Sequence, residues 1–376
     1  MLSSIMDILY APFIIALISA ILSFLISIVD KIVNNYGQVI IDINGGRKKL
    51  ELQGGAPLLS SLSNQEIFVP SACGGRGSCG ECKVKVLSDI GPVLPTEAPL
   101  LTDQQMKDGY RLSCQVKIRG DIQIELPEEL FAIQKFKGII HSIRDVTHDI
   151  KEVYIKLQTP DSISFTSGQY CQLVVPPYDK VKKSVQRAYS IASPPSDSGN
   201  LGFLIRLVPG GIATTYVHTK LNQGDSVELI GPFGDFYVRE TDAIMLCIAG
   251  GSGMAPFKSI FNDMLGKAQT GREVWYFFGA RTGKDLFYLD EMKAIEEKWD
   301  NFHFIPALSE PQEEDNWQGE TGLITDVLDK YLNERIDKQK PQEGYLCGSP
   351  GMLDACIEVL KRHNIPEEKI YFDKFA

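Results

Sequence analysis

Three cysteines in one short glycine-rich segment constrain this chain more than any other feature. Cys73, Cys79 and Cys82 lie in the run Cys-Gly-Gly-Arg-Gly-Ser-Cys-Gly-Glu-Cys, and Cys114 follows downstream in Leu-Ser-Cys-Gln. Four thiolates grouped in this way supply two sulfurs to each iron of a [2Fe–2S] cluster. Glycines let the loop fold around such a cluster and direct backbone N–H groups at its sulfurs. The four cysteines therefore predict a [2Fe–2S] centre and an electron carrier.

A structural zinc site also takes four thiolates, and it remains an alternative together with unligated thiols. Zinc sites usually contain two short Cys-x2–4-Cys pairs, whereas Cys114 stands alone. Val39–Ile43 and Lys49–Leu52 alternate as strands about an Asn44-Gly45-Gly46 turn. These patterns predict an α+β domain of the ferredoxin-like β-grasp type over residues 36–128.

Length, charge and cysteine usage limit the class of protein. A chain of 376 residues is too long for one ordinary core and predicts two or three domains. A formal net charge of −10 argues against nucleic-acid binding. The cysteines outside the predicted cluster lie in apolar or motif contexts, which favours a reducing cytoplasm over disulfide bonding.

An uncharged and mostly apolar run, Ile8–Val29, lies near the N-terminus. Its 22 residues would extend about 33 Å as a helix, against roughly 30 Å for the hydrocarbon layer of a membrane. Basic residues follow this run at Lys31 and at 47–49 but do not precede it, so the later domains are expected in the cytoplasm. We predict a single transmembrane helix within residues 1–33, anchored in the inner (cytoplasmic) membrane. A buried core helix or a cleaved leader is the alternative.

Short β-prone runs separated by Gly, Pro and Asp occupy residues 135–240 and predict a closed antiparallel barrel. One run ends in Arg187-Ala188-Tyr189-Ser190, which offers a guanidinium for a pyrophosphate, a flat phenol ring and a hydroxyl. Gly210–Thr215 offers glycines and a helix N-terminus to the same pyrophosphate, and Gly231–Phe236 follows a further strand. Arg-x-Tyr-Ser alone is more often plain surface and core. The three motifs together predict a flavin site.

Strands and helices alternate from Ala243 onward, which predicts a doubly wound parallel α/β domain over residues 243–376. Ile244–Ala249 leads through Gly250-Gly251-Ser252-Gly253-Met254 into an apolar helix, whose N-terminus suits a dinucleotide pyrophosphate. A later strand ends in Cys347-Gly348 at the carboxyl edge of the sheet, where ligands bind in such folds. The alternative for Cys347 is a small buried side chain that fills space.

From about Gly37 to its end the chain resembles the ferredoxin–NADP reductase superfamily, fused behind a [2Fe–2S] ferredoxin domain. This resemblance implies FAD as the flavin and assigns its binding to two sets of residues. The first set comprises Arg187, Tyr189 and Ser190, and the second, for the pyrophosphate, comprises Gly211, Ile212, Ala213 and Thr214. It also implies that Cys347, next to Gly348, lies beside the nicotinamide. The candidate catalytic residues are Cys347, Ser190 and Phe375.

The order of anchor, ferredoxin, FAD barrel and nucleotide domain is most similar to the F subunit of the sodium-translocating NADH:quinone reductase family. The Cys-x5-Cys-x2-Cys spacing, Phe278–Arg281 and Gly319–Gly322 share this similarity, whereas the tail Phe372–Ala376 departs from it. The resemblance implies that electrons pass from NADH through FAD and the cluster to membrane subunits, with quinone as an indirect acceptor. The reductase component of a multicomponent oxygenase and a redox sensor without turnover are the alternatives.

Two further residue-level predictions concern the nucleotide and the C-terminus. Relatives that bind NADP place Arg after the strand-end Ser, whereas Ser309 here precedes the acidic Glu310, which would repel a 2′-phosphate. We therefore expect NADH rather than NADPH as the substrate. Arg281, which is also within the predicted nucleotide site, is the residue that could still reach a 2′-phosphate. By resemblance to reductases with an aromatic C-terminus, Phe375 is predicted to stack over the isoalloxazine, and an ordinary packed aromatic ring is the alternative.

Overall fold

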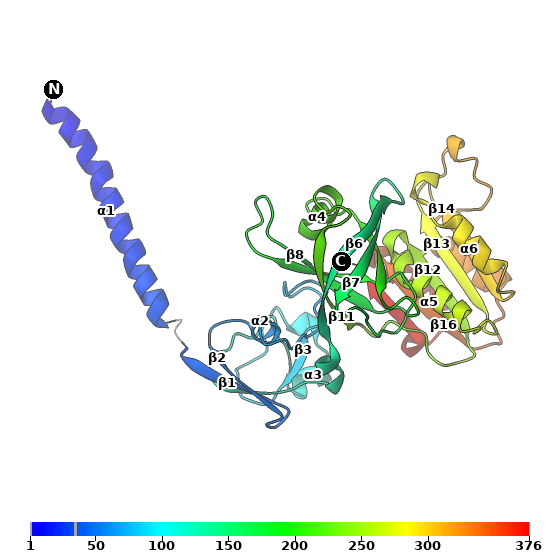
Figure 1. Ribbon diagram of the computed structural model, residues 1–376, viewed down its shortest axis with the longest axis horizontal. Coiled ribbons are helices and arrows are strands. Elements are labelled where there is room, and N and C mark those ends of the chain that lie inside the picture. Colours follow the sequence, from blue (N-terminus) through cyan, green and yellow to red (C-terminus); the bar gives the residue numbers. More distant parts are fainter. Residues whose placement is uncertain (1, 34–35, 376) are drawn as a thin grey trace. The chain divides into compact units, whose positions relative to one another are not determined.

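The computed structural model describes residues 2–33 and 36–375 (Figure 1). Contacts divide the chain into two compact units, each considered by itself below. The first comprises Met1–Val69 and Gly75–Phe131, and the second comprises Pro70–Gly74 and Ala132–Ala376. The short segment Pro70–Gly74, which includes Cys73, thus belongs to the same unit as the C-terminal two thirds of the chain.

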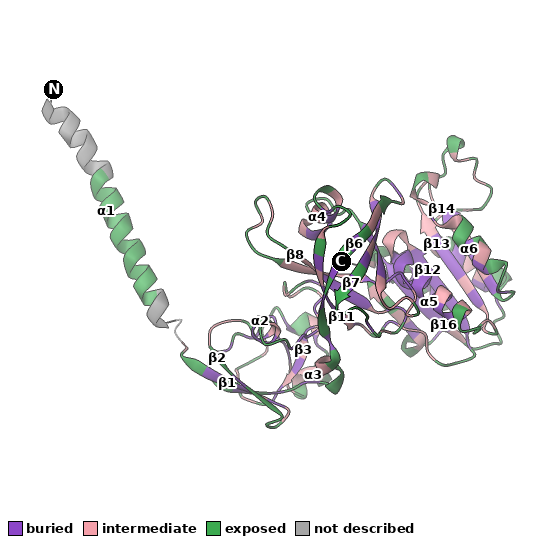
Figure 2. Ribbon diagram, in the orientation of Figure 1, coloured by how far each residue is buried: buried purple, intermediate pink, exposed green. Residues whose placement is uncertain are grey.

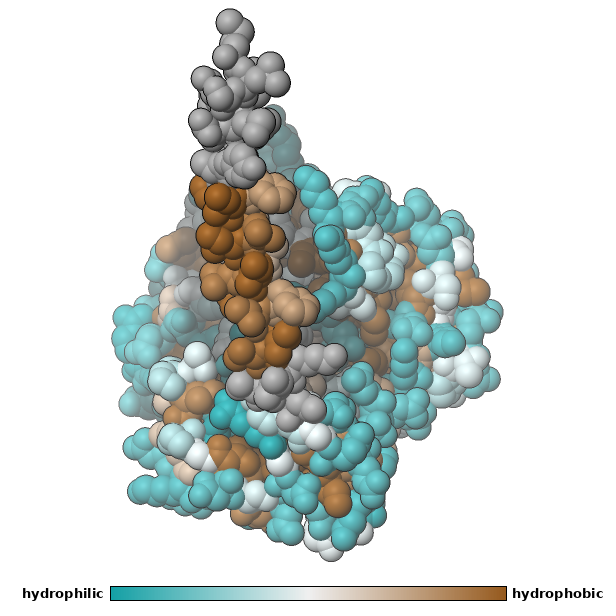
Figure 3. Space-filling view, turned by 90° about the vertical axis from the view of Figure 1, so that its left-hand side faces the viewer, coloured by the Kyte–Doolittle hydropathy of each residue, from teal (hydrophilic) through white to brown (hydrophobic). Residues whose placement is uncertain are grey.

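Helix α1 (Leu2–Val33) precedes the first strand. Its described side chains, residues 13–29, are apolar or serine and are all exposed (Figures 2 and 3). Within the described residues, no helix reaches the length and apolarity that a membrane crossing requires. The predicted span Ile8–Val29 includes residues 8–12, whose side chains lie outside those described. The single transmembrane helix is therefore not confirmed.

The first unit contains a mixed sheet with strand order β2-β1-β5-β3-β4. Its strands are β1 (Gln38–Ile43), β2 (Lys48–Gln53), β3 (Lys83–Val86), β4 (Tyr110–Leu112) and β5 (Ile122–Glu125), and its short helices are α2 (Leu58–Ser63) and α3 (Asp103–Lys107). β1 pairs antiparallel with β2 and parallel with β5. Leu58 and Leu62 of α2 are fully buried in the core that the sheet covers. This arrangement agrees with the predicted α+β ferredoxin-like domain.

The second unit begins with a six-stranded antiparallel sheet of order β10-β7-β6-β11-β8-β9. Its strands are β6 (Gln134–Asp145), β7 (Ile150–Thr159), β8 (Tyr170–Val175), β9 (Val185–Ser190), β10 (Asn200–Arg206) and β11 (Ser226–Phe233), and its helix is α4 (Ile212–Thr219). A bridge between Ile191 and Phe203 joins the two edge strands, so the sheet closes into the predicted barrel.

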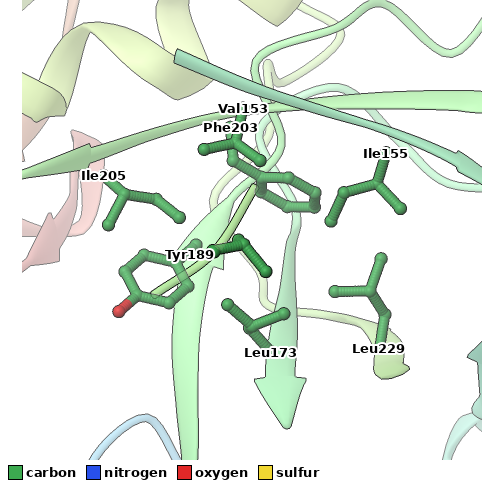
Figure 4. A pocket seen from close by; sticks show the side chains of 8 residues that line it. Val153, Ile155, Leu173, Tyr189, Phe203, Ile205 and Leu229 are labelled. Atoms are coloured by element: carbon green, nitrogen blue, oxygen red, sulfur yellow. The ribbon is translucent and has the colours of Figure 1, made fainter. Parts of the chain in front are cut away.

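The interior of this barrel is filled by side chains rather than open to a ligand (Figure 4). Eight apolar or aromatic residues line a cavity of about 10 Å³, which is at most the room of one water molecule. The lining residues are Val153, Ile155, Leu173, Tyr189, Phe203, Ile205, Leu221 and Leu229. A cofactor of flavin size must therefore bind outside the barrel, at its rim or surface.

A six-stranded, wholly parallel sheet of order β15-β14-β13-β12-β16-β17 completes the second unit. Its strands are β12 (Ile244–Gly250), β13 (Val274–Ala280), β14 (Phe302–Leu308), β15 (Glu320–Thr321), β16 (Gln342–Gly348) and β17 (Ile370–Lys374). The helices are α5 (Met254–Gly266), α6 (Leu289–Glu296), α7 (Ile324–Glu334) and α8 (Pro350–Arg362).

Helices cover both faces of the parallel sheet, as a doubly wound fold requires. Successive residues of β12 alternate between two cores, so that Cys247 packs with the α5 and α6 side and Leu246 packs with the α7 and α8 side. Because both faces are buried, the strand is apolar without a polar alternation, which is why the sequence shows it as a continuous hydrophobic run (Figure 2). The predicted α/β fold is confirmed.

Candidate functional site

The predicted flavin-binding side chains come from the end of β9. Tyr189 is half-buried, and in Figure 4 its hydroxyl points away from the aliphatic side chains that line the cavity. Burial raises the pKa of Tyr189, and the charge of Arg187 offsets part of that rise, so the ring is neutral near pH 7. Ser190 is buried, and its Oγ donates a hydrogen bond to Oδ2 of Asp373, 3.4 Å away.

The predicted pyrophosphate segment forms the N-terminus of α4. Gly211 is the N-cap, and no side chain caps the first turn, which leaves this helix end suited to an anion. A Cβ at position 211 would lie 2.6 Å from Oγ1 of Thr214, so the turn requires glycine. Thr214 itself is buried and accepts a hydrogen bond from the N–H of Val208 at 3.1 Å. Tyr178 donates to the carbonyl of Ile212 at 2.6 Å, and Ala213 lies in the barrel core.

The predicted nucleotide turn joins β12 to α5. Gly251–Gly253 forms a 3₁₀ turn, and Gly253 caps α5 without any side-chain hydrogen bond. A Cβ at position 253 would lie 2.2 Å from the carbonyl oxygen of Cys347, and one at Gly250 would lie 2.9 Å from Sδ of Met352. The glycines therefore allow this turn to lie against the end of β16 and the start of α8, while the fully buried Met254 anchors the first turn of α5.

Cys347 and the C-terminal segment meet at the same edge of the sheet. Cys347 is opposite Asp373 in the β16–β17 register, and the N–H of Phe375 donates to the carbonyl of Gly348 at 2.9 Å. Burial, and secondly the charge of Asp373, raise the pKa of the Cys347 thiol well above its usual value. The thiol is therefore protonated and unsuited to act as a nucleophile. The partly buried ring of Phe375 packs against the adjacent core.

Asp373 is the residue of this site that sequence reasoning missed. It belongs to β17, the last strand, and the only signal for it is a lone carboxylate in a short C-terminal strand. Its bond with Ser190 brings the flavin-binding strand of the barrel to the carboxyl edge of the parallel sheet. The candidate catalytic residue of the barrel, Ser190, and that of the parallel-sheet domain, Cys347, thus both lie next to Asp373.

The predicted nucleotide-selecting residues lie at the ends of β13 and β14. Nη2 of Arg281 is 2.9 Å from Oε2 of Glu310, and both side chains are exposed. The hydrogen bond with Glu310 raises the pKa of Arg281, which stays charged. Ser309 is held by a bond from its N–H to the carbonyl of Ala280 at 3.0 Å. The guanidinium group of Arg281 is therefore already hydrogen-bonded to Glu310, and a 2′-phosphate would have to compete with this carboxylate.

The four predicted cluster ligands are divided between the two units, with Cys73 in the second and the others in the first. The pKa of the Cys82 thiol is raised first by a hydrogen bond with Cys114 and then by burial. Among the residues described, no group of three or more His, Cys, Asp or Glu side chains surrounds a single metal position. A [2Fe–2S] cluster needs two sulfurs per iron, and a neighbouring pair of thiols fits that requirement.

The loop around Cys79 depends on glycine conformations. Gly74, Gly75, Gly77 and Gly80 all have positive φ, which other residues rarely adopt. The amide Nε2 of Gln115 lies 3.5 Å from Sγ of Cys114 and donates toward it, as the surroundings of a cluster sulfur require. These features fit the predicted [2Fe–2S] centre.

Buried polar contacts fix the segments on either side of the cysteine loop. Glu97 is fully buried and accepts hydrogen bonds from Nη2 of Arg111 at 2.6 Å and from the N–H of Leu112 at 2.8 Å, two residues before Cys114.

In the second unit, Nε2 of Gln172 on β8 donates to the carbonyl of Ser71 at 2.9 Å, and both residues are buried. The segment that contains Cys73 is thus bonded to a strand of the barrel.

Comparison with known protein families assigns all three folded regions. Residues 41–119 match the 2Fe-2S iron-sulfur cluster binding domain, residues 137–237 the oxidoreductase FAD-binding domain, and residues 247–358 the oxidoreductase NAD-binding domain. The fold and the site therefore define an NADH oxidoreductase that contains FAD and a [2Fe–2S] cluster, as predicted. Residue-level roles within the site stay predictions.

Relatives identify the family more closely. The F subunit of the Na(+)-translocating NADH-quinone reductase of Idiomarina loihiensis is 38% identical over 90% of this chain and 92% of its own length. The corresponding protein of a Marinomonas species is 35% identical over 96% of both chains. The chain belongs to the family of F subunits of the Na(+)-translocating NADH-quinone reductase, which confirms the predicted resemblance.

Solved structures of similar architecture cover nearly the whole chain. The Amycolatopsis cytochrome P450 reductase has a TM-score of 0.71 and 27% identity, covering 90% of this chain and 98% of its own. The ferredoxin reductase of carbazole 1,9a-dioxygenase has a TM-score of 0.67 and 27% identity, covering 90% and 99%. The same combination of domains thus serves more than one kind of reductase.

The first prediction concerns the turn between β12 and α5. Gly253→Ala should lower the rate of flavin reduction by NADH at least about tenfold, because the added methyl group displaces the turn from the Cys347 carbonyl at a cost of about 1–3 kcal/mol. FAD content should stay unchanged. The matched control is Gly351→Ala in α8, where an added Cβ meets nothing within 4 Å. Stopped-flow absorbance measures both variants, and equal rates in them would contradict the assignment.

Proposed function

We propose that this chain oxidises NADH in its second unit and delivers the electrons one at a time, through its iron–sulfur domain, to membrane subunits that reduce quinone. When bound, FAD supplies the conversion between a hydride, which carries two electrons, and the single electrons that a [2Fe–2S] cluster accepts. The geometry that supports this proposal most directly is the bond between Ser190 and Asp373, because it joins the barrel to the nucleotide edge.

The residues of this site hold and orient their ligands. Arg187 and the N-terminus of α4 are proposed to hold the pyrophosphate of FAD, and the N-terminus of α5 that of NADH, because neither helix end has a side-chain cap. Ser190 offers a hydroxyl next to the carboxylate of Asp373. Cys347 contributes shape rather than charge, since its thiol is buried and protonated. Phe375 is proposed to cover the flavin until the nicotinamide displaces it, and removal of residues 375–376 without any change in flavin reduction would contradict this role.

The second prediction tests electron flow itself. Anaerobic addition of NADH to the purified full-length protein should bleach the flavin absorbance and produce the electron paramagnetic resonance signal of a reduced [2Fe–2S] cluster. Cys79→Ala should keep the flavin bleaching and lose the cluster signal. A protein that contains zinc in place of iron, or a flavin that NADH does not reduce, would refute the proposed function.

The third prediction concerns nucleotide choice. The wild-type protein should have a higher kcat/KM for NADH than for NADPH, and Glu310→Gln should raise kcat/KM for NADPH by about tenfold, because Arg281 becomes available to a 2′-phosphate. Glu314→Gln is the matched control, since Glu314 forms an exposed pair with Lys284 on the same surface. A wild-type preference for NADPH, or equal gains in both variants, would overturn this explanation.

We further propose that α1 anchors the chain in the inner membrane with its folded domains in the cytoplasm. The exposed apolar side chains of residues 13–29 support this, as does the name of the relatives, which describes one subunit of an enzyme that translocates Na⁺. Exposure of these apolar side chains to water is unfavourable in free energy, and a lipid bilayer would remove that exposure.

The fourth prediction tests the anchor. Removal of residues 1–35 should move the protein from the membrane fraction to the soluble fraction and leave NADH oxidation with a soluble dye unchanged. The control is the full-length chain washed with alkaline carbonate, which should stay with the membrane. Recovery of the full-length chain in the soluble fraction would rule the anchor out.

The reductase component of an oxygenase is the second candidate, because one of the solved structures above is named as the ferredoxin reductase in a dioxygenase and the other as a cytochrome P450 reductase. The higher identity to the relatives from the Na(+)-translocating enzyme, 38% against 27%, favours the membrane complex. Identification of the proteins that co-purify after gentle detergent extraction separates the two candidates.

A further inference from the structure

Helix α5 forms the junction between the nucleotide-binding sheet and the barrel within the second unit. One core contains residues of both modules, including Ile150 and Phe236 from the barrel side and Phe257 and Ile260 from α5. The rings of Phe236 and Phe257 meet edge to face at 5.8 Å. Apolar contacts of this kind hold surfaces together but do not by themselves fix how one surface is placed on the other, since the hydrophobic effect is non-directional.

Polar side chains on the same side of α5 reach into the barrel. Oγ of Ser259 donates to the carbonyl of Ser193 at 2.7 Å, and Ser193 follows β9 by three residues. Oδ2 of Asp263 accepts from Oγ of Ser167 at 3.1 Å. The bond to Ser193 connects α5 to the segment that continues from the flavin-binding motif, and the bond from Ser167 connects α5 to the segment before β8.

A buried ion pair also joins α5 to the barrel. Lys258 is 9% exposed and Glu152, on β7 of the barrel, is 6% exposed. Nζ of Lys258 lies 3.3 Å from Oε1 of Glu152 and 3.9 Å from the centre of the Tyr288 ring. Tyr288 in turn donates its hydroxyl to Glu152, and Arg144 of β6 also contacts this carboxylate. Lysine and glutamate are rarely buried unless they are paired in this way.

The charge state of the pair follows from these neighbours. Burial alone would raise the pKa of Glu152, but its hydrogen-bond donors and the nearby cations hold that pKa below the usual value. The carboxylate is therefore ionised at neutral pH and attracts Lys258. A second carboxylate, Glu291 of α6, also lies 3.3 Å from Nζ of Lys258, but its side chain is 46% exposed.

A buried ion pair is a weak source of stability, because desolvation of the two charges offsets most of their attraction. Its hydrogen bonds are nevertheless directional and charge-assisted, so they hold the two partners at a defined place. Lys258 lies in the first half of α5, shortly after the turn formed by Gly250–Gly253. A shift of Lys258 against Glu152 would therefore move that turn relative to the barrel.

We propose that Lys258 and Glu152 are positioning residues that set the nucleotide-binding turn against the flavin-binding strand for hydride transfer. This inference rests on the proposed function, since it assumes that NADH reduces FAD in this unit. The reacting atoms of a transfer must be held at about 3–3.5 Å, and a displacement of about 1 Å can cost a hundredfold in rate.

The nucleotide domain provides a matched control with the same residue types. Nζ of Lys330 on α7 lies 3.0 Å from Glu320, and the hydroxyl of Tyr331 donates to Glu320 at 3.0 Å. All three residues of this Lys–Glu–Tyr group belong to elements of the parallel-sheet domain, β15 and α7. Lys330→Met thus removes an ion pair of the same residue types, although a more exposed one, without loosening the junction.

The fifth prediction compares Lys258→Met, Lys258→Arg and Lys330→Met in the full-length protein with bound FAD. At saturating NADH, Lys258→Met should reduce the flavin about 10- to 100-fold more slowly, with the apparent Kd for NADH changed less than about threefold. Its primary isotope effect with NADH deuterated at C4 should be larger than that of the wild type, because hydride transfer becomes the slow step. Lys258→Arg should recover most of the rate, and Lys330→Met should match the wild type.

A second variant guards against simple unfolding. The double variant Lys258→Met/Glu152→Leu removes both buried charges, so it should bind FAD and remain folded but reduce the flavin as slowly as Lys258→Met. Wild-type rates in either variant, or a loss of rate that only follows a loss of FAD, would overturn the proposal and assign the pair to stability. If NADH fails to reduce the flavin of the wild-type protein, the proposed function itself is wrong.

Discussion

The close approach of Gly253 to the backbone of Cys347 is the contact on which the nucleotide side of the second unit depends. A Cβ at position 253 would lie 2.2 Å from the carbonyl oxygen of Cys347, so only glycine lets the β12–α5 turn lie on the end of β16. This contact places the uncapped N-terminus of α5 at the carboxyl edge of the sheet, where Cys347 and Asp373 are in register. Because Ser190 of the barrel donates a hydrogen bond to the same Asp373, the barrel and the parallel-sheet domain meet at this carboxyl edge.

Local structure was largely predictable from the sequence. The hairpin of β1 and β2 turns at Asn44-Gly45-Gly46, where all three residues adopt positive φ, so the turn chemistry fixed the register. The strand predicted at Ile244–Ala249 is β12, extended by Gly250, because a strand buried on both faces gives a continuous apolar run. The glycines of Gly250–Gly253 likewise predicted a tight turn between β12 and α5, where a Cβ at Gly253 would lie 2.2 Å from the carbonyl oxygen of Cys347.

Contacts between distant residues were not predictable in the same way. A period of apolar residues indicates which face of an element is buried, but it does not name the partner on the other side. Lys258 would be expected in solvent from its type alone, yet it pairs with Glu152 in the interior. The bond of Ser190 with Asp373 spans 183 positions, and the inclusion of Pro70–Gly74 in the second unit breaks the order of the predicted domains.

The flavin and nucleotide modules, between which the proposed hydride transfer takes place, belong to one unit of the chain. Hydride transfer requires the donor and acceptor atoms almost in contact, so the flavin and nucleotide modules must be held together closely, and they share one buried core that includes Ile150 of the barrel and Phe257 of α5. Single electrons pass between groups that do not touch, so the same closeness is not required of the cluster domain. The contact of Ser71 with Gln172 nevertheless keeps the segment of one cluster ligand, Cys73, on the barrel. The chain therefore needs a tight junction only where atoms, rather than electrons alone, are exchanged.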